Sequence, residues 1–141
     1  MSQFSSFLAH NAIRSEPVRV SVSRRFTGGD GAPEEWLAGP ITGIEDEVLR
    51  REATRRIPAP GGRGGFVLET DYNQYIGLLA ARCTLYPDLN DAELQNSYGV
   101  LSPDSLLKTM LTAGEFAEYA ARVQELCGFD MTEAVASAKK R

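Results

Sequence analysis

The sequence contains few of the residues that build metal sites and nucleophilic active sites. It has one histidine, His10, and two cysteines, Cys83 and Cys127. A metal site needs several clustered His, Cys or carboxylate ligands, which this set does not supply. Both cysteines fall among apolar residues of predicted helices, so we interpret them as reduced core thiols rather than as a disulfide. The histidine is interpreted as an exposed or capping residue, and we expect no catalytic residue, metal or cofactor.

Long apolar segments are also missing. No run approaches the roughly 20 residues that a membrane span requires. The first residues lack the basic start and the apolar core of a secretory signal peptide. The glycine cluster at 60–65 has neither a following Lys-Ser/Thr nor the spacing of a phosphate-binding loop, so it predicts a flexible connector. We therefore expect a cytoplasmic protein that does not bind membranes.

A basic face of the kind that binds nucleic acid is absent as well. The net charge is −4, and residues 66–141 carry eleven acidic and six basic side chains. Three of the four basic residues in 50–56 follow acidic ones at four-residue spacing, which favours a salt-bridged, solvated helix face. The pairs are Asp46–Arg50, Glu47–Arg51 and Glu52–Arg56. An acidic body disfavours nucleic acid as a partner.

The first part of the chain has the pattern of a β-hairpin. Val18, Val20 and Val22 alternate with polar residues, as in a half-buried strand. A glycine-rich turn at 27–33 follows, and then a short return strand at 35–38 that places Trp36 over the valines. A lone hairpin is marginal in water, so we expect it to pack on the helices or to add to a partner's sheet.

Two longer helices are predicted next. Thr42 with Glu45 forms a capping-box pattern before a helix at 43–57, which Pro58 and Pro60 terminate. After a loop at 59–70, a second helix is predicted at 71–85. Its inward residues are expected to be Tyr72, Tyr75, Ile76, Leu79 and Cys83.

Short helices follow in quick succession after Tyr86. Their start signals are Asn90 with Glu93, Ser102 with Pro103, Thr112 with Glu115, and Asp130 with Glu133. Gly99 and Gly128 are expected stops, since glycine readily takes the left-handed conformation that ends a helix. Because stops and starts recur within a few residues, the helices must double back as close neighbours.

These patterns predict one domain at 1–141 with an α+β, mainly α fold. An N-terminal β-hairpin would pack on a compact bundle of about five short helices. The expected segments are an arm and hairpin at 1–41, a helix at 42–58, a Pro/Gly-rich loop at 59–70 and a helical subdomain at 71–141.

The wording PDLNDAELQNSYGVLSPDSLLKTMLTAGEF, with VSVSRRF near the start, resembles the XkdN-like tail assembly chaperones of long-tailed phages and prophages. The resemblance implies a protein that binds the tape measure protein, keeps it soluble during tail tube assembly and is absent from the mature particle. Tail tube subunits are a further implied partner, and the sequence leaves self-association of the chain open. The alternative is a structural tail protein that stays in the particle.

Apolar positions of the C-terminal helices are candidates for the partner-binding surface. We hypothesise that Met110, Phe116 and Tyr119 are exposed and contact the tape measure protein. The same aromatic stripe also fits a helix core, which is the alternative for these residues. The sequence shows neither a paired acid and base nor an activated nucleophile, so we expect no enzyme.

Overall fold

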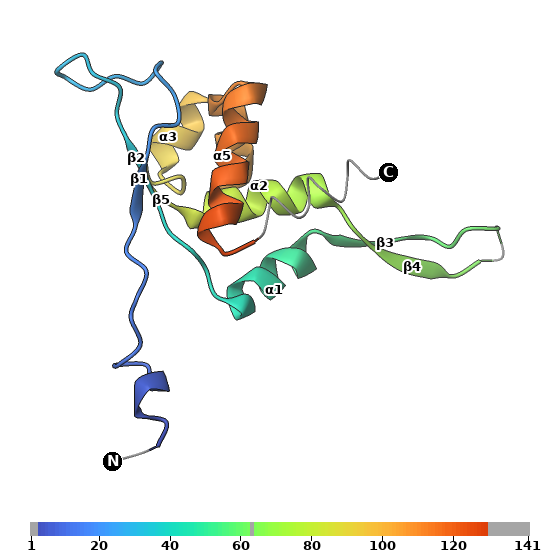
Figure 1. The fold of residues 1–141 in the computed structure, drawn as a ribbon. Coiled ribbons are helices and arrows are strands. Elements are labelled where there is room, and N and C mark those ends of the chain that lie inside the picture. The colour runs from blue at the N-terminus through green and yellow to red at the C-terminus, as the bar shows by residue number, and fades with distance from the viewer. Residues whose placement is uncertain (1–2, 63, 130–141) are drawn as a thin grey trace, which may run out of the picture.

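The computed structural model describes residues 3–62 and 64–129 (Figure 1). A 3-10 turn, Ser5–Phe7, lies in the N-terminal arm. The strands within these ranges are β1 (Val18–Val20), β2 (Trp36–Ala38), β3 (Thr54–Pro58), β4 (Phe66–Thr70) and β5 (Thr84–Tyr86). The α-helices within them are α1 (Gly43–Glu52), α2 (Tyr72–Cys83), α3 (Ala92–Ser97), α4 (Pro103–Met110) and α5 (Ala113–Leu126). The fold is α+β and mainly helical, as predicted.

The predicted N-terminal hairpin is present and packs on the helices. Strands β1 and β2 pair antiparallel, with Val20 opposite Trp36. The buried Trp36 ring meets the Tyr119 ring of α5 edge to face, with the ring centroids 5.4 Å apart. Aromatic pairs prefer this geometry because the positive ring edge meets the negative face. The hairpin is thereby fixed to α5.

A third strand, β5, replaces the end of the helix predicted at 71–85. Helix α2 stops at Cys83, and β5 pairs antiparallel with β2. Two hydrogen bonds satisfy the last carbonyls of the helix: Thr84 Oγ1 donates to the Ala80 carbonyl at 2.7 Å, and the Gly39 amide donates to the Cys83 carbonyl at 2.9 Å. The open edge of β2 therefore captures residues whose apolar spacing also fitted a helix.

The helix predicted at 43–57 is also shorter than expected. Helix α1 ends at Glu52, and Thr54 Oγ1 donates to the Arg50 carbonyl at 2.6 Å. Residues 54–58 instead form β3, which pairs along its whole length with β4. The predicted loop at 59–70 is consequently wrong for 66–70. The predicted Glu52–Arg56 pair is also wrong, because the Arg56 guanidinium lies over the Phe66 ring.

Helix α1 is fixed to α2 through one of the other predicted charge pairs, Asp46–Arg50. Arg50 Nε donates to Asp46 at 2.9 Å, and the predicted Glu47–Arg51 pair is present at 3.3 Å. The Tyr75 hydroxyl donates to the Asp46 carboxylate, and Arg50 also lies over the Tyr75 ring. Burial and this hydrogen bond raise the pKa of Tyr75. The phenol therefore stays a donor to the carboxylate.

Most predicted helix ends are confirmed. Capping boxes form at Thr42 with Glu45 and at Thr112 with Glu115. Pro103 opens α4 after Ser102, although the Ser102 side chain makes no capping hydrogen bond. The predicted Asn90 cap is wrong: Asp91 caps α3 by accepting from the Leu94 amide, because the chain from Asp88 to Asp91 forms a turn first.

Gly99 and Gly128 both have positive φ and end their helices as predicted. The start predicted at Asp130 with Glu133 lies outside the described residues.

The core lies where α2 crosses α4 and α5. Its largest fully buried side chains are Trp36, Tyr119, Leu79, Leu106, Leu107, Val123 and Cys83. Of the residues predicted to point inward from α2, Tyr75, Leu79 and Cys83 are buried and Ile76 is half-buried. Tyr72 is 64% exposed, which corrects its assignment to the core, since the helix begins at this residue where β4 leaves the body.

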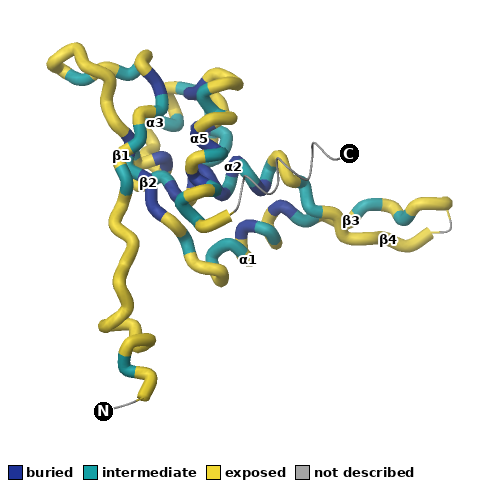
Figure 2. The backbone as a smooth tube through the Cα atoms, viewed as in Figure 1, coloured by how far each residue is buried: buried dark blue, intermediate teal, exposed yellow. Residues whose placement is uncertain are grey.

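Two segments extend away from this body. The N-terminal arm runs in one direction, and the hairpin of β3 and β4 runs in another (Figure 1). Both are largely exposed, whereas the buried residues gather in the body (Figure 2).

Candidate partner-binding surface

The three residues predicted to bind a partner lie mostly inside the protein. Met110 and Tyr119 are 6% and 2% exposed, so the expectation that they are exposed is wrong for both. Phe116 is half-buried against the core, and Lys108 Nζ lies 5.9 Å from its ring centre. A surface partner would therefore reach Phe116 before it reached the other two. Binding by these residues stays a hypothesis.

Tyr119 has a clear structural role. Thr84 Oγ1 already donates to the Ala80 carbonyl, so the Tyr119 hydroxyl is the donor in its 2.6 Å hydrogen bond with Thr84. Burial raises the pKa of Tyr119 to about 12. The phenol thus joins α5 to the junction of α2 and β5.

An open groove runs along the side of β5 that faces away from Tyr119. It consists of two hollows, of about 380 and 590 Å³, that share Arg82 and Leu85. We call it the Leu85 groove. The first hollow lies between α1, α2 and the start of α4, and its lining includes Leu49, Glu52, Leu78, Ala81, Pro103 and Asp104. The second lies where the arm passes the start of α1, and its lining includes Arg14, Pro17, Pro40, Ile41, Thr42 and Glu45.

Leu85 faces this groove because side chains alternate along a strand. Thr84 points to Tyr119 in the core, so its neighbour Leu85 points to the opposite side. Gly39 of the neighbouring segment lies beside it: a Cβ atom at this position would be in van der Waals contact with Leu85 Cδ1, at 3.4 Å. Leu85 is nevertheless 53% exposed, so much of its apolar surface is open to a partner.

The rims of the Leu85 groove carry fixed charges. Arg82 Nη2 donates to Glu45 Oε2 at 2.9 Å. The hydrogen bond with the Thr42 backbone, followed by that from Arg82, lowers the pKa of Glu45, so this carboxylate stays ionised near neutral pH. Glu52 and Asp104 line the other end. The groove therefore combines an apolar floor with charged sides.

Two exposed apolar residues of α1 lie outside the lining of the groove, on a helix row that leads to it. Ile44 and Val48 are 77% and 43% exposed. They lie one turn apart, and Glu52, which lines the groove, continues the same row. The sequence pattern places Ile44 and Val48 on an apolar line, but that line faces solvent. The sequence did not identify Leu85 as a groove residue, because the apolar pattern around it also fitted the end of a helix.

In the part of the chain that the structure describes, the candidate metal-ligating and nucleophilic side chains include Cys83, Cys127 and His10. Residues 3–62 and 64–129 contain no cluster of three or more potential metal ligands. The sulfur atoms of Cys83 and Cys127 lie 3.5 Å apart, and both are free thiols. Burial raises the pKa of Cys83, so this thiol stays protonated and unreactive at neutral pH. His10 is exposed in the arm. No helix in this part of the chain has both the length and the apolar character needed to cross a bilayer.

Comparisons with known proteins agree with the resemblance seen in the sequence. The family model described as phage XkdN-like tail assembly chaperone protein matches residues 4–139. The chain is 28% identical over 127 residues to the phage-like element PBSX protein XkdN of Bacillus subtilis, which covers 89% of this chain and 84% of that protein. It is 29% identical over the same length to the uncharacterized protein YqbN of the same organism, with the same coverage.

The fold also matches that of a solved structure. The crystal structure of the protein YqbN superposes with a TM-score of 0.76 at 25% identity. The match covers 92% of this chain and 99% of that one. The similarity therefore extends over most of the chain.

Proposed function

Because the chain belongs to the XkdN-like phage tail assembly chaperone family, we propose that it binds the tape measure protein and keeps it soluble while the tail tube assembles. In this proposal the protein acts in the host cytoplasm and leaves before the particle is complete. Tail tube subunits are secondary partners. The family's role is non-catalytic.

The Leu85 groove is the observation that carries this proposal. An amphipathic helix binds a partner by laying its apolar face into an apolar groove. Leu85, Leu78 and Leu49 supply such a floor between α1 and α2. The charged groups at the rims can meet polar residues on the sides of the bound helix. A long helical protein with repeated apolar stripes would then be covered by several copies of the chaperone.

The open shape of the groove suits temporary binding. Leu85, Ile44 and Val48 are a small set of exposed apolar side chains, so covering them at one site removes a limited apolar area from water. Weak contacts become effective when several act on one chain, and they release readily when tube subunits compete. A chaperone needs this reversibility.

Co-expression with the tape measure protein tests the proposal. Leu85→Asp places a charge in the lining of the Leu85 groove, and Val48→Asp places one on the α1 row that Glu52 continues into it. Both should reduce the soluble tape measure protein that is recovered with the chaperone. Leu101→Asp is the matched control, because Leu101 is 94% exposed and does not line the groove. Equal recovery with all three variants would contradict binding at the groove.

Phe116→Asp tests the earlier hypothesis for α5 in the same assay. Met110 and Tyr119 are unsuitable for charge substitution, because burying an unpaired charge in the core would unfold the protein. If Phe116→Asp alone abolishes recovery while its melting temperature is unchanged, the binding surface lies on α5 and not at Leu85.

Mass spectrometry of purified particles separates the proposal from the alternative. A chaperone is expected in the assembly lysate and absent from tails. Recovery of the chain from purified tails in a fixed ratio to the tube subunits would instead identify a structural tail protein.

A further inference from the structure

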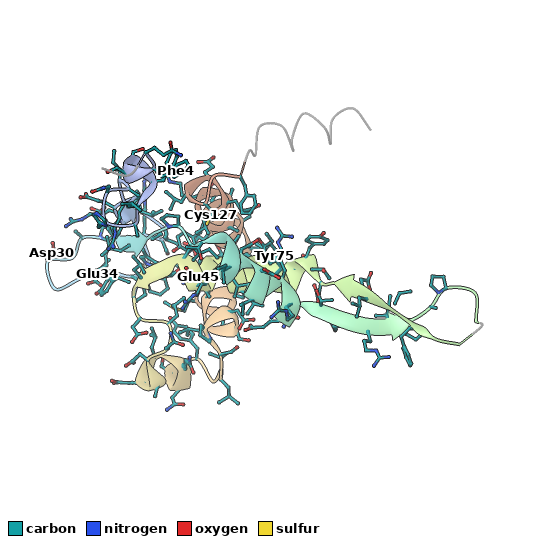
Figure 3. The ribbon with its side chains drawn as sticks, turned by 90° about the horizontal axis from the view of Figure 1, so that it is seen from below. Phe4, Asp30, Glu34, Glu45, Tyr75 and Cys127 are labelled. Carbon is teal, nitrogen blue, oxygen red and sulfur yellow. The ribbon has the colours of Figure 1, made fainter. Side chains whose placement is uncertain are left out.

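The hairpin of β3 and β4 has no evident role in the body of the protein. It leaves the body beyond Tyr75, and no other element of the described residues lies beside it (Figure 3). Within the described residues its sheet has only these two strands. Phe66, Val67 and Leu68 are 62%, 40% and 73% exposed. An isolated two-stranded hairpin with exposed apolar residues is marginal in water and favours a partner.

The hydrogen bonds at the two ends of the hairpin show which backbone groups point outward. The Asp71 amide donates to the Ala53 carbonyl at 2.8 Å, and the Ala59 amide donates to the Gly65 carbonyl at 3.2 Å. In an antiparallel pair, bonded and non-bonded residue pairs alternate. In the observed register, the non-bonded pairs are therefore Thr54–Thr70, Arg56–Leu68 and Pro58–Phe66. Their amides and carbonyls point away from the hairpin.

The two outer edges differ in what they offer to another strand. On β3 the outward residues include Pro58, which has no amide hydrogen, and Arg56. Proline and charged residues are the features that protect edge strands from pairing. On β4 the outward residues are Phe66, Leu68 and Thr70, each of which has both an amide and a carbonyl. Only the β4 edge is therefore suited to receive a strand.

We propose that β4 pairs antiparallel with β4 of a second copy, about a two-fold axis at Leu68. Leu68 would then lie opposite its counterpart, and Phe66 would lie opposite Thr70 of the other copy. All of these residues direct their backbone groups outward, so each pair can exchange both hydrogen bonds. The product is a four-stranded sheet with a β3 strand at each outer edge.

Charge favours this pairing over the other symmetric one. In the β4 pairing Glu69 lies opposite Val67 of the second copy, so no like charges meet. Pairing β3 with β3 about Arg56 would place two arginines opposite each other, and like charges in that position are destabilising. The same register also brings the two exposed Leu68 side chains together, between the Arg56 side chains on the outer strands.

The pairing is independent of the tape measure protein, and the chain alone can test it. Sedimentation velocity of the full chain over a range of concentrations is expected to show a weak, reversible dimer, because the contact is smaller than a standard interface. Leu68→Pro removes an outward amide at the axis without removing a bond between β3 and β4. It should weaken dimerisation about tenfold or more, since both copies lose a donor.

Arg56→Pro, compared with Arg56→Ala, is the matched control, because Arg56 is the register partner of Leu68 and its amide points out of the other edge. Arg56→Ala accounts for the side chain that lies over Phe66. Arg56→Pro should dimerise as Arg56→Ala does. Leu68→Lys, which keeps the amide and places like charges at the axis, should also abolish the dimer. A wild-type chain that stays monomeric at every concentration would overturn the proposal. Equal weakening by Leu68→Pro and by Arg56→Pro relative to Arg56→Ala, or a dimer retained by Leu68→Lys, would do the same.

Discussion

At the residue scale, one arginine joins the N-terminal segment to the C-terminal helices. Arg25 Nη2 donates to the Met110 carbonyl at 2.7 Å and to Glu115 Oε1 at 2.6 Å. Glu115 also forms the capping box with Thr112. One carboxylate therefore closes the start of α5 and holds the segment that leads from β1 to β2.

Glu115 should make the stability depend on pH in the acid range. The Arg25 guanidinium, followed by hydrogen bonds from Ser23 and the Thr112 backbone, lowers the pKa of Glu115 from 4.5 to about 2. A carboxylate with a lowered pKa stabilises the fold above its unfolded value, and this contribution is lost as the pH falls through the folded value. Glu115→Gln should therefore melt at a lower temperature than the wild type at neutral pH. The difference should shrink between pH 4.5 and pH 2.

Thermal melts at several pH values measure this, with Glu93→Gln on α3 as a control at an exposed site. A melting difference between Glu115→Gln and the wild type that stayed constant down to pH 2 would contradict the assignment.

What each individual side chain packs against was the hardest feature to predict from the sequence. The spacing of Phe116, Tyr119 and Val123 correctly identifies an apolar stripe, but it does not say what covers that stripe. In the structure Trp36, some 80 positions earlier, packs on Tyr119. Leu85 shows the converse, because it belongs to an apolar pattern and yet lines an open groove. Both outcomes depend on contacts between distant segments.

At the scale of elements, the helix starts that depend on neighbouring residues were predictable. The strands that form by pairing with distant segments were not. Thr42–Glu45 and Thr112–Glu115 need only neighbouring residues to form their capping boxes. Residues 54–58 fit either a helix or a strand, and their choice depends on 66–70. The glycines between these strands have positive φ, which lets the chain reverse there. Tertiary pairing thus overrides a weak local preference.

Two helix caps that look alike in the sequence should contribute differently to the stability of the protein. Thr112 accepts from the Glu115 amide, whereas the Ser102 side chain makes no capping hydrogen bond. Thr112→Ala should lower the free energy of unfolding by about 1 kcal/mol, the usual value of a side-chain cap. Ser102→Ala should change it by less than about 0.5 kcal/mol. Urea unfolding followed by circular dichroism compares them, and equal losses would show that the observed geometry does not set the energy.

At the scale of the whole molecule, burial divides the chain into a body and two exposed extensions. Trp36, Tyr119 and α2 bring distant parts of the sequence into one core. The hairpin of β3 and β4 takes little part in that core, since most of its residues are exposed. The fold class follows from the helix signals in the sequence. The groove and the free strand edge depend on how the elements pack, and the sequence therefore did not reveal them.

Hydrogen exchange should reveal this division directly. In dilute solution, the amides of Ile57 and Val67 should exchange much faster than that of Leu79, because a two-stranded ladder opens without exposing the core, whereas α2 opens only with the body. Amide-resolved exchange by NMR measures the difference. Equal protection of Ile57 and Leu79 would mean that the hairpin unfolds only together with the body. If exchange at the Leu68 amide slows as the protein concentration rises while exchange at Arg56 does not, the protected edge is β4, because these two amides point out of opposite sides of one hairpin.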